Sequence, residues 1–162
     1  MFYIVIGQSG AGKTTFVKSH LLREPYTLTE DVVPLTADAD GRVALGRYGI
    51  GKRTEGTDTL PYNAKDRIKK QLSRLAAEGK TVVLEGDRIN NSEIFDHVLR
   101  LGGGAKLYLV TCKLHNSMKR LRAAGSTISP TFVKGTRTKA KHMFLAYASR
   151  MHGEIINTDG EE

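Results

Sequence analysis

The residues best suited to chemistry stand near the start of the chain, in a glycine-rich segment that matches G-x-x-x-x-G-K-[ST]. Backbone N–H groups of such a loop point inward around a β-phosphate, a lysine reaches the β/γ oxygens, and a hydroxyl ligates Mg²⁺. We therefore expect an ATP or GTP site in which Lys13 acts on the phosphates and Thr14 binds the metal. The residues expected to bind the nucleotide are Gly7, Gln8, Ser9, Gly10, Ala11, Gly12, Lys13, Thr14 and Thr15.

The segments on either side of this loop favour a strand before it and a helix after it. Residues 2–6 are an apolar, β-branched run typical of a buried strand, and residues 15–22 carry apolar side chains at helical spacing. Strand, loop and helix in this order place a helix N-terminus against a phosphate. A plain glycine turn followed by an incidental lysine is the structural alternative.

Further along the chain, strand-like apolar runs alternate with helical patterns. We predict a β-hairpin over 32–48, then a helix that is capped by 57–59, has Pro61 in its first turn and ends at Gly79. Further strands are predicted at 81–85, 105–111 and 154–157, and further helices at 92–101, 116–124 and 131–151. Together with the phosphate loop, the alternation predicts a three-layer α/β fold of the P-loop NTPase type, with a mainly parallel sheet and helices on both faces, in one domain over 1–162.

Composition limits the class of protein. No stretch approaches the roughly 20 apolar residues of a membrane helix, and the N-terminal apolar run is too short and lacks the basic leader of a signal peptide. The single cysteine, Cys112, follows an apolar run, so we expect a buried structural thiol in a reducing cytoplasm. The five histidines show no metal-ligand spacing, and we expect no zinc site.

Positive charge is concentrated in the second half of the chain. The formal net charge is +8, yet residues 97–153 contain eleven Lys or Arg and no Asp or Glu. Because eleven cations are more than a nucleotide can use, this region suggests a polyanionic partner. Its central part, 113–142, is expected to form a lid over the transferred phosphoryl group. A solubilising basic face is the alternative. The eleven residues are Arg100, Lys106, Lys113, Lys119, Arg120, Arg122, Lys134, Arg137, Lys139, Lys141 and Arg150.

A phosphate loop alone does not separate GTPases, motor ATPases and kinases. The chain lacks the guanine-reading N-K-x-D and the transporter signature, and it is short for a helicase, which leaves a small kinase. Such an enzyme needs a carboxylate near Mg²⁺, a base for the attacking hydroxyl and arginines over the transferred phosphoryl group. Just past a predicted strand, Glu85 can hold Mg²⁺ through water, Asp87 can do the same or take the proton, and Arg88 can hold acceptor or phosphate. A strand-end salt bridge is the alternative for this cluster.

Asp58 is the second candidate base. It follows a glycine-rich segment, which we expect to be mobile, and could therefore move toward an acceptor hydroxyl, although a helix N-cap also explains it. Arg120, Arg122 and Arg137 are the expected lid arginines. Because residues at i and i+2 do not share a helix face, Arg120 and Arg122 should differ in role, and one of them could be merely solvated.

Three further segments, 45–48 (Leu-Gly-Arg-Tyr), 56–60 (Gly-Thr-Asp-Thr-Leu) and 84–88 (Leu-Glu-Gly-Asp-Arg), carry a resemblance together with the phosphate loop. The chain resembles, roughly from residue 1 to 151, the small P-loop kinases of bacteriophages that phosphorylate 5-hydroxymethyluracil within DNA. The resemblance implies ATP as donor, the hydroxymethyl group as acceptor, and Asp58 at the acceptor site. It also implies a role in building hypermodified thymines that protect viral DNA from host restriction.

The basic half of the chain agrees with that resemblance, because a kinase acting on a base in a polymer must hold the backbone. A base inside a duplex is hard to reach, so we expect it to be flipped out or single-stranded. Tyr48, Tyr62 and Phe132 are candidates for stacking on it, although each could be a core residue. Two other functions stay open: a kinase for a free nucleoside or other small hydroxyl compound, and a nucleotide-switched DNA-binding ATPase.

Overall fold

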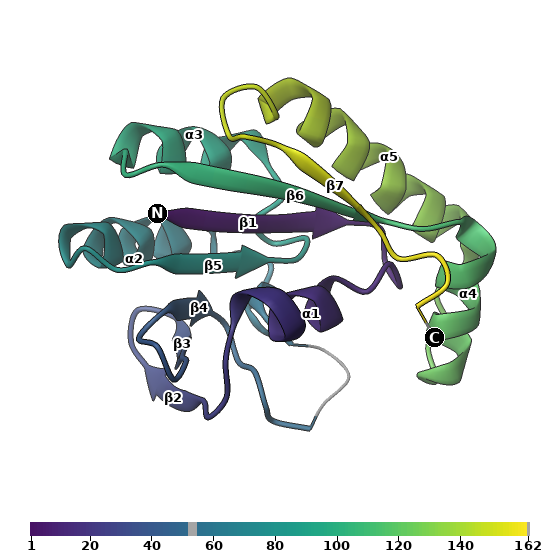
Figure 1. Cartoon of the computed structure of the whole chain (residues 1–162), viewed down its shortest axis with the longest axis horizontal. Coiled ribbons are helices and arrows are strands. Elements are labelled where there is room, and N and C mark those ends of the chain that lie inside the picture. Colours follow the sequence, from purple (N-terminus) through teal and green to yellow (C-terminus); the bar gives the residue numbers. More distant parts are fainter. Residues whose placement is uncertain (52–54, 162) are drawn as a thin grey trace.

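A seven-stranded sheet runs through the computed structural model, which describes residues 1–51 and 55–161 (Figure 1). The strand order is β2-β3-β4-β5-β1-β6-β7. All pairings from β4 to β7 in this order are parallel, whereas β2, β3 and β4 pair antiparallel. The predicted α/β class with a mainly parallel sheet is confirmed. The strands are β1 (Phe2–Gly7), β2 (Thr27–Glu30), β3 (Pro34–Ala37), β4 (Val43–Leu45), β5 (Val82–Glu85), β6 (Ala105–Thr111) and β7 (Glu154–Asn157).

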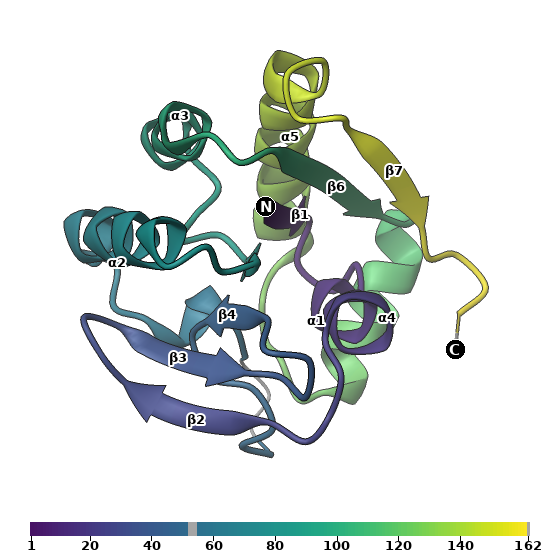
Figure 2. The same ribbon diagram turned by 60° about the vertical axis from the view of Figure 1, so that its left-hand side comes forward.

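Helices cover both faces of the sheet (Figure 2). On one face lie α2 (Lys65–Ala77), α3 (Ser92–Leu101) and α5 (Pro130–Tyr147), and on the other lies α1 (Lys13–Phe16), which continues as a π-helical turn over Val17–Leu21. The remaining helix, α4 (Leu114–Ala123), follows β6 near its carboxyl end and packs on α5.

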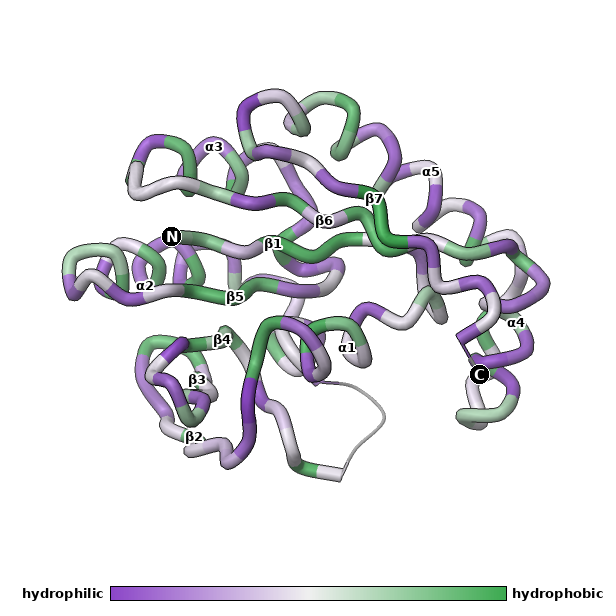
Figure 3. Tube along the Cα trace, viewed as in Figure 1, coloured by the Kyte–Doolittle hydropathy of each residue, from purple (hydrophilic) through white to green (hydrophobic). Residues whose placement is uncertain are grey.

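Alternation along the strands divides the core between these two layers. In β1, Ile4 and Ile6 belong to the cluster that includes the apolar stripes of α2, α3 and α5, while Val5 belongs to the cluster of α1. All three side chains are at most 1% exposed. Figure 3 shows the hydrophobic stretches following β1 and β5 through the middle of the molecule. A strand buried on both faces explains why the sequence of β1 is continuously apolar rather than alternating.

The parallel strands also fix where the connecting loops meet. The register pairs Val5 of β1 with Glu85 of β5 and Gly7 with Val110 of β6. Loops that follow β1, β4, β5, β6 and β7 therefore emerge at one edge of the sheet, which is where α/β proteins bind ligands.

Two sequence-based expectations need correction: where the helix after residues 57–59 begins, and how many antiparallel strands surround residues 32–48. The helix expected to be capped by 57–59 begins only at Lys65, with Ala64 as its N-cap, while 57–59 forms a separate 3₁₀ turn and Pro61 lies outside both. The side chains that could have capped it are used elsewhere: Thr57 donates to the Glu85 carbonyl, and Asp58 accepts from the Asp87 N–H.

The predicted hairpin is present as β3 and β4, but β2 adds a third antiparallel strand to it. Cys112 is buried, as predicted, with its Sγ 3.1 Å from the Ser117 hydroxyl. Across the described residues, no helix combines the length and apolar character needed to span a bilayer. The expectation of a mobile segment around 49–56 falls partly on residues 52–54, which lie outside the described residues.

The contact between α3 and α5 provides a test of the fold. Phe95 is fully buried, and its ring meets that of Tyr147 edge-on with centroids 5.0 Å apart. Replacing Phe95 by alanine should lower the free energy of unfolding by about 3–5 kcal/mol, because it leaves a cavity between helix and sheet. Urea denaturation measures this, with Leu145→Ala, 78% exposed on α5, as the control expected to change little. Equal effects of the two substitutions would contradict this packing.

Candidate functional site

The loop between β1 and α1 is held in shape from several sides. Gly12, the N-cap of α1, has φ +94°, a conformation that side chains with a Cβ rarely adopt. The Ser9 N–H donates to the Thr136 hydroxyl of α5 at 3.1 Å, which ties the loop to the opposite layer. Lys13 extends back over the loop, and its Nζ donates to the carbonyls of Gly7 and Gln8, both at 3.0 Å.

Gln8 has a structural role that its place in the motif did not reveal. Its side chain is buried and donates to the Cys112 carbonyl at 2.7 Å and the Ser117 hydroxyl at 3.0 Å, while its Oε1 accepts from Thr111. The side chain therefore fastens the phosphate loop to the end of β6, and only its backbone is left for a nucleotide.

Glu85 lies at the end of β5 and is joined to the loop through Thr14. Its Oε2 accepts from the Thr14 hydroxyl at 3.1 Å, and its Oε1 accepts from the Tyr48 hydroxyl at 2.7 Å. The carboxyl is only 2% exposed. Burial raises its pKa to about 7, and the hydrogen bonds and the positive charge of Lys13 counteract this only in part. Burial and Glu85 also raise the pKa of Tyr48 well above its usual value, so this hydroxyl keeps its proton and stays a donor.

Thr14 and Glu85 are suited to a magnesium ion. Mg²⁺ is usually bound by one or two carboxylates and hydroxyl groups, with waters and substrate phosphates completing its octahedron. The expected third ligand, Asp87, is not brought to this pair: its carboxylate is half exposed and pairs with Lys139 of α5 at 3.0 Å. Within the described residues, no group of three or more His, Cys, Asp or Glu side chains could hold a metal on its own.

Asp58 lies beside this pair and lines the same cleft. A cavity of about 490 Å³ is bordered by the phosphate loop, Lys13, Thr14, Glu85, Asp58 and Glu55. The Asp58 carboxylate accepts from the Asp87 N–H at 3.0 Å, and Arg88 Nη1 lies 3.8 Å from the same oxygen. Gly86 permits this approach, because a Cβ there would stand 2.8 Å from Asp58 Oδ1. Of the two candidate bases, Asp58 is therefore the one whose side chain faces the cleft.

The three lid arginines have different surroundings. Arg120 donates to the carbonyls of Gly10 and Ala11 and to Thr158, at 3.4, 3.3 and 2.8 Å, so it clamps the phosphate loop to the end of β7. Arg122 donates to the carbonyls of Ser126 and Ile128, both at 2.8 Å. The third, Arg137 of α5, has a buried Nε without a hydrogen-bond partner among the described residues. Only Arg120 lines the cleft, and a catalytic lid stays a prediction.

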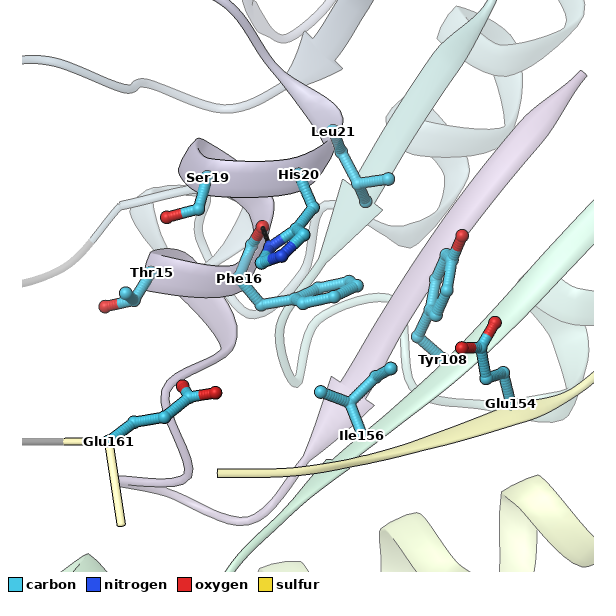
Figure 4. A pocket seen from close by; sticks show the side chains of 9 residues that line it. All are labelled: Thr15, Phe16, Ser19, His20, Leu21, Tyr108, Glu154, Ile156 and Glu161. Atoms are coloured by element: carbon cyan, nitrogen blue, oxygen red, sulfur yellow. Dashed lines mark hydrogen bonds between the residues drawn. The ribbon is translucent and has the colours of Figure 1, made fainter. Parts of the chain in front are cut away.

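Two further clefts adjoin the loop. One of about 290 Å³ is lined by Gly12, Thr15, Arg120, Thr158 and Glu161, and shares the first three with the larger cleft. The other, of about 380 Å³, lies between the helix that begins with α1 and strands β6 and β7, and contains none of the predicted catalytic residues (Figure 4). There the Phe16 and His20 rings stack with centroids 4.9 Å apart and face side chains of β6 and β7.

Sequence reasoning missed two residues of the site. Tyr48 was expected either to stack on a base or to be a core residue; it is 1% exposed and its hydroxyl donates to Glu85, so the stacking role is wrong and the core alternative is confirmed. Glu55 lines the cleft, where its carboxylate pairs with Lys18 at 3.0 Å and accepts from the Gly49 N–H. The Tyr48–Glu85 and Lys18–Glu55 contacts each join residues 37 positions apart, so no local sequence pattern predicts them.

Comparison with known proteins adds only structures. No protein-family model matches the chain, and a search of curated proteins found no match. Similar solved structures include deoxyadenosine kinase from M. mycoides with bound dCTP, at 10% identity and a TM-score of 0.47 over 98% of this chain and 91% of that one. The same enzyme with bound dATP has 7% identity and a TM-score of 0.48, and the match covers 100% of this chain and 93% of that one. With the products dCMP and a flexible dCDP bound, the same enzyme has 10% sequence identity and a TM-score of 0.45, and the match covers 98% of this chain and 90% of that one.

The buried carboxyl predicts a pH dependence of stability. Between pH 4.5, the ordinary pKa, and about 7, the folded chain keeps a proton on Glu85 that the unfolded chain has released. Stability therefore falls as pH rises through this window and then levels off. Relative to Glu85→Gln, the metal-free wild type should lose about 3 kcal/mol between pH 4 and 8, as measured by urea denaturation of both proteins. A difference that does not vary with pH would contradict the burial of this carboxyl.

Proposed function

We propose that this chain is an ATP-dependent kinase that phosphorylates the hydroxymethyl group of 5-hydroxymethyluracil in DNA. The observation that carries the proposal is the shared cleft: Lys13, Thr14 and Glu85, suited to a magnesium-bound triphosphate, border the same space as the carboxylate of Asp58. A phosphate donor and a hydroxyl acceptor can therefore meet there.

The segments that carry the family resemblance support the proposal, because they contact one another around this cleft. Arg47 bridges Gly56, Tyr48 donates to Glu85, and Asp58 accepts from the Asp87 N–H. Residues up to 37 positions apart along the chain thus form one structural unit beside the phosphate loop. If the resemblance reflects a common acceptor site, the segments that form this site must lie together in this way.

Each group has a definite task in the proposed reaction. Loop N–H groups hold the triphosphate, and the Lys13 ammonium stabilises the negative charge that develops on the leaving β-phosphate. Thr14 and Glu85 would hold Mg²⁺, whose charge neutralises the phosphate oxygens. Asp58 accepts the proton of the hydroxymethyl group as its oxygen forms a bond to the γ-phosphorus. The bond from that phosphorus to the β,γ-bridging oxygen breaks, and ADP leaves.

We assign the base of the donor nucleotide to the cleft of about 290 Å³. That cleft shares Gly12, Thr15 and Arg120 with the larger one but lies toward Thr158 and Glu161, away from Asp58. With the triphosphate in the loop, a donor base near Thr158 would leave the part of the larger cleft lined by Asp58 to the acceptor.

A kinase for a free nucleoside or another small hydroxyl compound is the second candidate, and one observation favours it. Many basic side chains of the 97–153 region are engaged within the chain: Lys106 with Glu154, Lys139 with Asp87, and Arg150 over the Tyr147 ring. Arg120 and Arg122 bind backbone carbonyls. The excess of positive charge available to a polyanion is therefore smaller than the sequence suggests, although Lys134 and Lys141 lie exposed on α5.

One experiment separates these functions. The protein is incubated with γ-labelled ATP and either hydroxymethyluracil-containing DNA, ordinary DNA or free nucleosides. Label in the modified polymer alone supports the proposal, label in a small product supports the second candidate, and free phosphate alone indicates a nucleotide-switched ATPase. Binding to DNA should also weaken steeply with salt if the backbone is held by basic side chains.

The lysine of the loop gives a direct mutational test. Lys13→Ala should reduce phosphate transfer by at least about 100-fold, because the charge stabilising the leaving phosphate is lost. Lys80→Ala, an exposed lysine in the turn before β5, is the matched control and should keep full activity. Near-normal transfer by Lys13→Ala, in a protein with unchanged circular dichroism, would refute the role of the loop.

The choice of base is tested by two isosteric changes. Asp58→Asn should keep ATP binding and lose roughly 10²- to 10⁴-fold in turnover, because the carboxylate facing the cleft can no longer accept the proton. Asp87→Asn should have a far smaller effect, since that carboxylate pairs with Lys139. Single-turnover rates measure both, and the reverse ranking would assign the base to Asp87.

A further inference from the structure

Tyr62 is the most exposed large hydrophobic residue among those described, at 86%. It lies in the connection between the 3₁₀ turn Thr57–Thr59 and α2. Single exposed aromatic residues are common and do not by themselves indicate a binding site. What sets this one apart is the group that holds it.

The Tyr62 ring packs against a guanidinium that is itself fixed. The Cζ atom of Arg88 lies 3.7 Å from the ring centroid, close enough for a cation–π contact. Arg88 Nε donates to the Leu60 carbonyl at 3.1 Å, and the Arg88 side chain is only 17% exposed. The ring is thus supported on one face while most of its surface is open to solvent. A flat apolar surface held in this way is suited to stacking, because little conformational entropy is lost on binding.

The same guanidinium leads from the ring to the cleft. Arg88 Nη1 lies 3.8 Å from Asp58 Oδ1, and Asp58 lines the cleft of the phosphate loop. Tyr62 therefore stands one residue contact away from the carboxylate that we assign as base. The acceptor hydroxyl is joined to its pyrimidine by a single carbon, so a base whose hydroxyl reaches Asp58 must have its ring close by.

Phe132, the other exposed candidate aromatic, lacks such support. It is 56% exposed at the start of α5, and its ring has no aromatic or cationic partner within the described part of the chain. The two aromatic side chains thus differ in the feature that matters, a fixed orientation next to Asp58.

We propose that Tyr62, held by Arg88, is the platform on which the acceptor base stacks. This inference rests on the proposed function, whose acceptor is a pyrimidine in DNA. It adds a residue that recognises the base as a planar ring, independently of the phosphate chemistry. It also favours a base that is unpaired or flipped out, since a base within a duplex has no free face.

Binding of two oligonucleotides tests the platform without requiring transfer. Fluorescent single strands carry either 5-hydroxymethyluracil or an abasic site at one central position, and anisotropy gives the two affinities. The wild type should bind the first roughly 10- to 100-fold more tightly, which is the range that base–aromatic stacking provides. Tyr62→Leu should bind both equally, whereas Tyr62→Phe, which keeps the ring, should retain the preference. Phe132→Leu is the matched control and should also retain it.

Kinetics give an independent readout. Tyr62→Leu should raise the KM for the modified oligonucleotide roughly 10- to 100-fold while leaving kcat and the KM for ATP nearly unchanged. A wild-type base preference in Tyr62→Leu, or its loss in Phe132→Leu alone, would overturn the platform and leave the proposed function standing. Base-dependent binding through Tyr62 without any transfer would instead overturn the proposed function and leave the platform.

Discussion

The hydrogen bond between the Thr14 hydroxyl and the Glu85 carboxylate joins the two halves of the site. Thr14 lies in the first turn of α1, after β1, and Glu85 ends β5, 71 residues later. They meet because β1 and β5 are parallel neighbours with Val5 opposite Glu85, which sends both carboxyl ends to the same edge. If this register slipped by one residue, Glu85 would turn to the other face of the sheet. The position of the candidate metal site is therefore a property of sheet pairing.

Glu85 also illustrates how such a site trades stability for chemistry. A buried carboxyl is destabilising when ionised, and its pKa of about 7 expresses that cost. Tyr48 donates to one of its oxygens and Thr14 to the other, which keeps the side chain in one orientation. A divalent cation would supply the missing charge compensation and favour the ionised form. In the proposed reaction, part of this energetic penalty would be relieved when the magnesium-bound nucleotide binds.

Features set by interactions between neighbouring residues could be predicted from the sequence, whereas features set by contacts between distant segments could not. The phosphate loop and the central strands depend on local residue types, and their positions were predicted within a residue or two. The start of α2 was misplaced because Thr57 and Asp58 bond to the β5–α3 connection rather than to their own helix. Likewise, Tyr48 looked like a stacking residue until the fold brought it beneath Glu85. Contacts of this kind are set by tertiary structure, which a single sequence does not display.

The most direct test of the central claim is a crystal structure with a non-hydrolysable ATP analogue and Mg²⁺. We expect the β- and γ-phosphates within the loop that ends at Lys13, and the metal on the Thr14 hydroxyl with Glu85 beside it. The adenine of the analogue should point toward Thr158, on the side away from Asp58. Phosphates bound elsewhere, or a Lys13 ammonium that stays on the Gly7 and Gln8 carbonyls at saturating nucleotide, would contradict this description of the site.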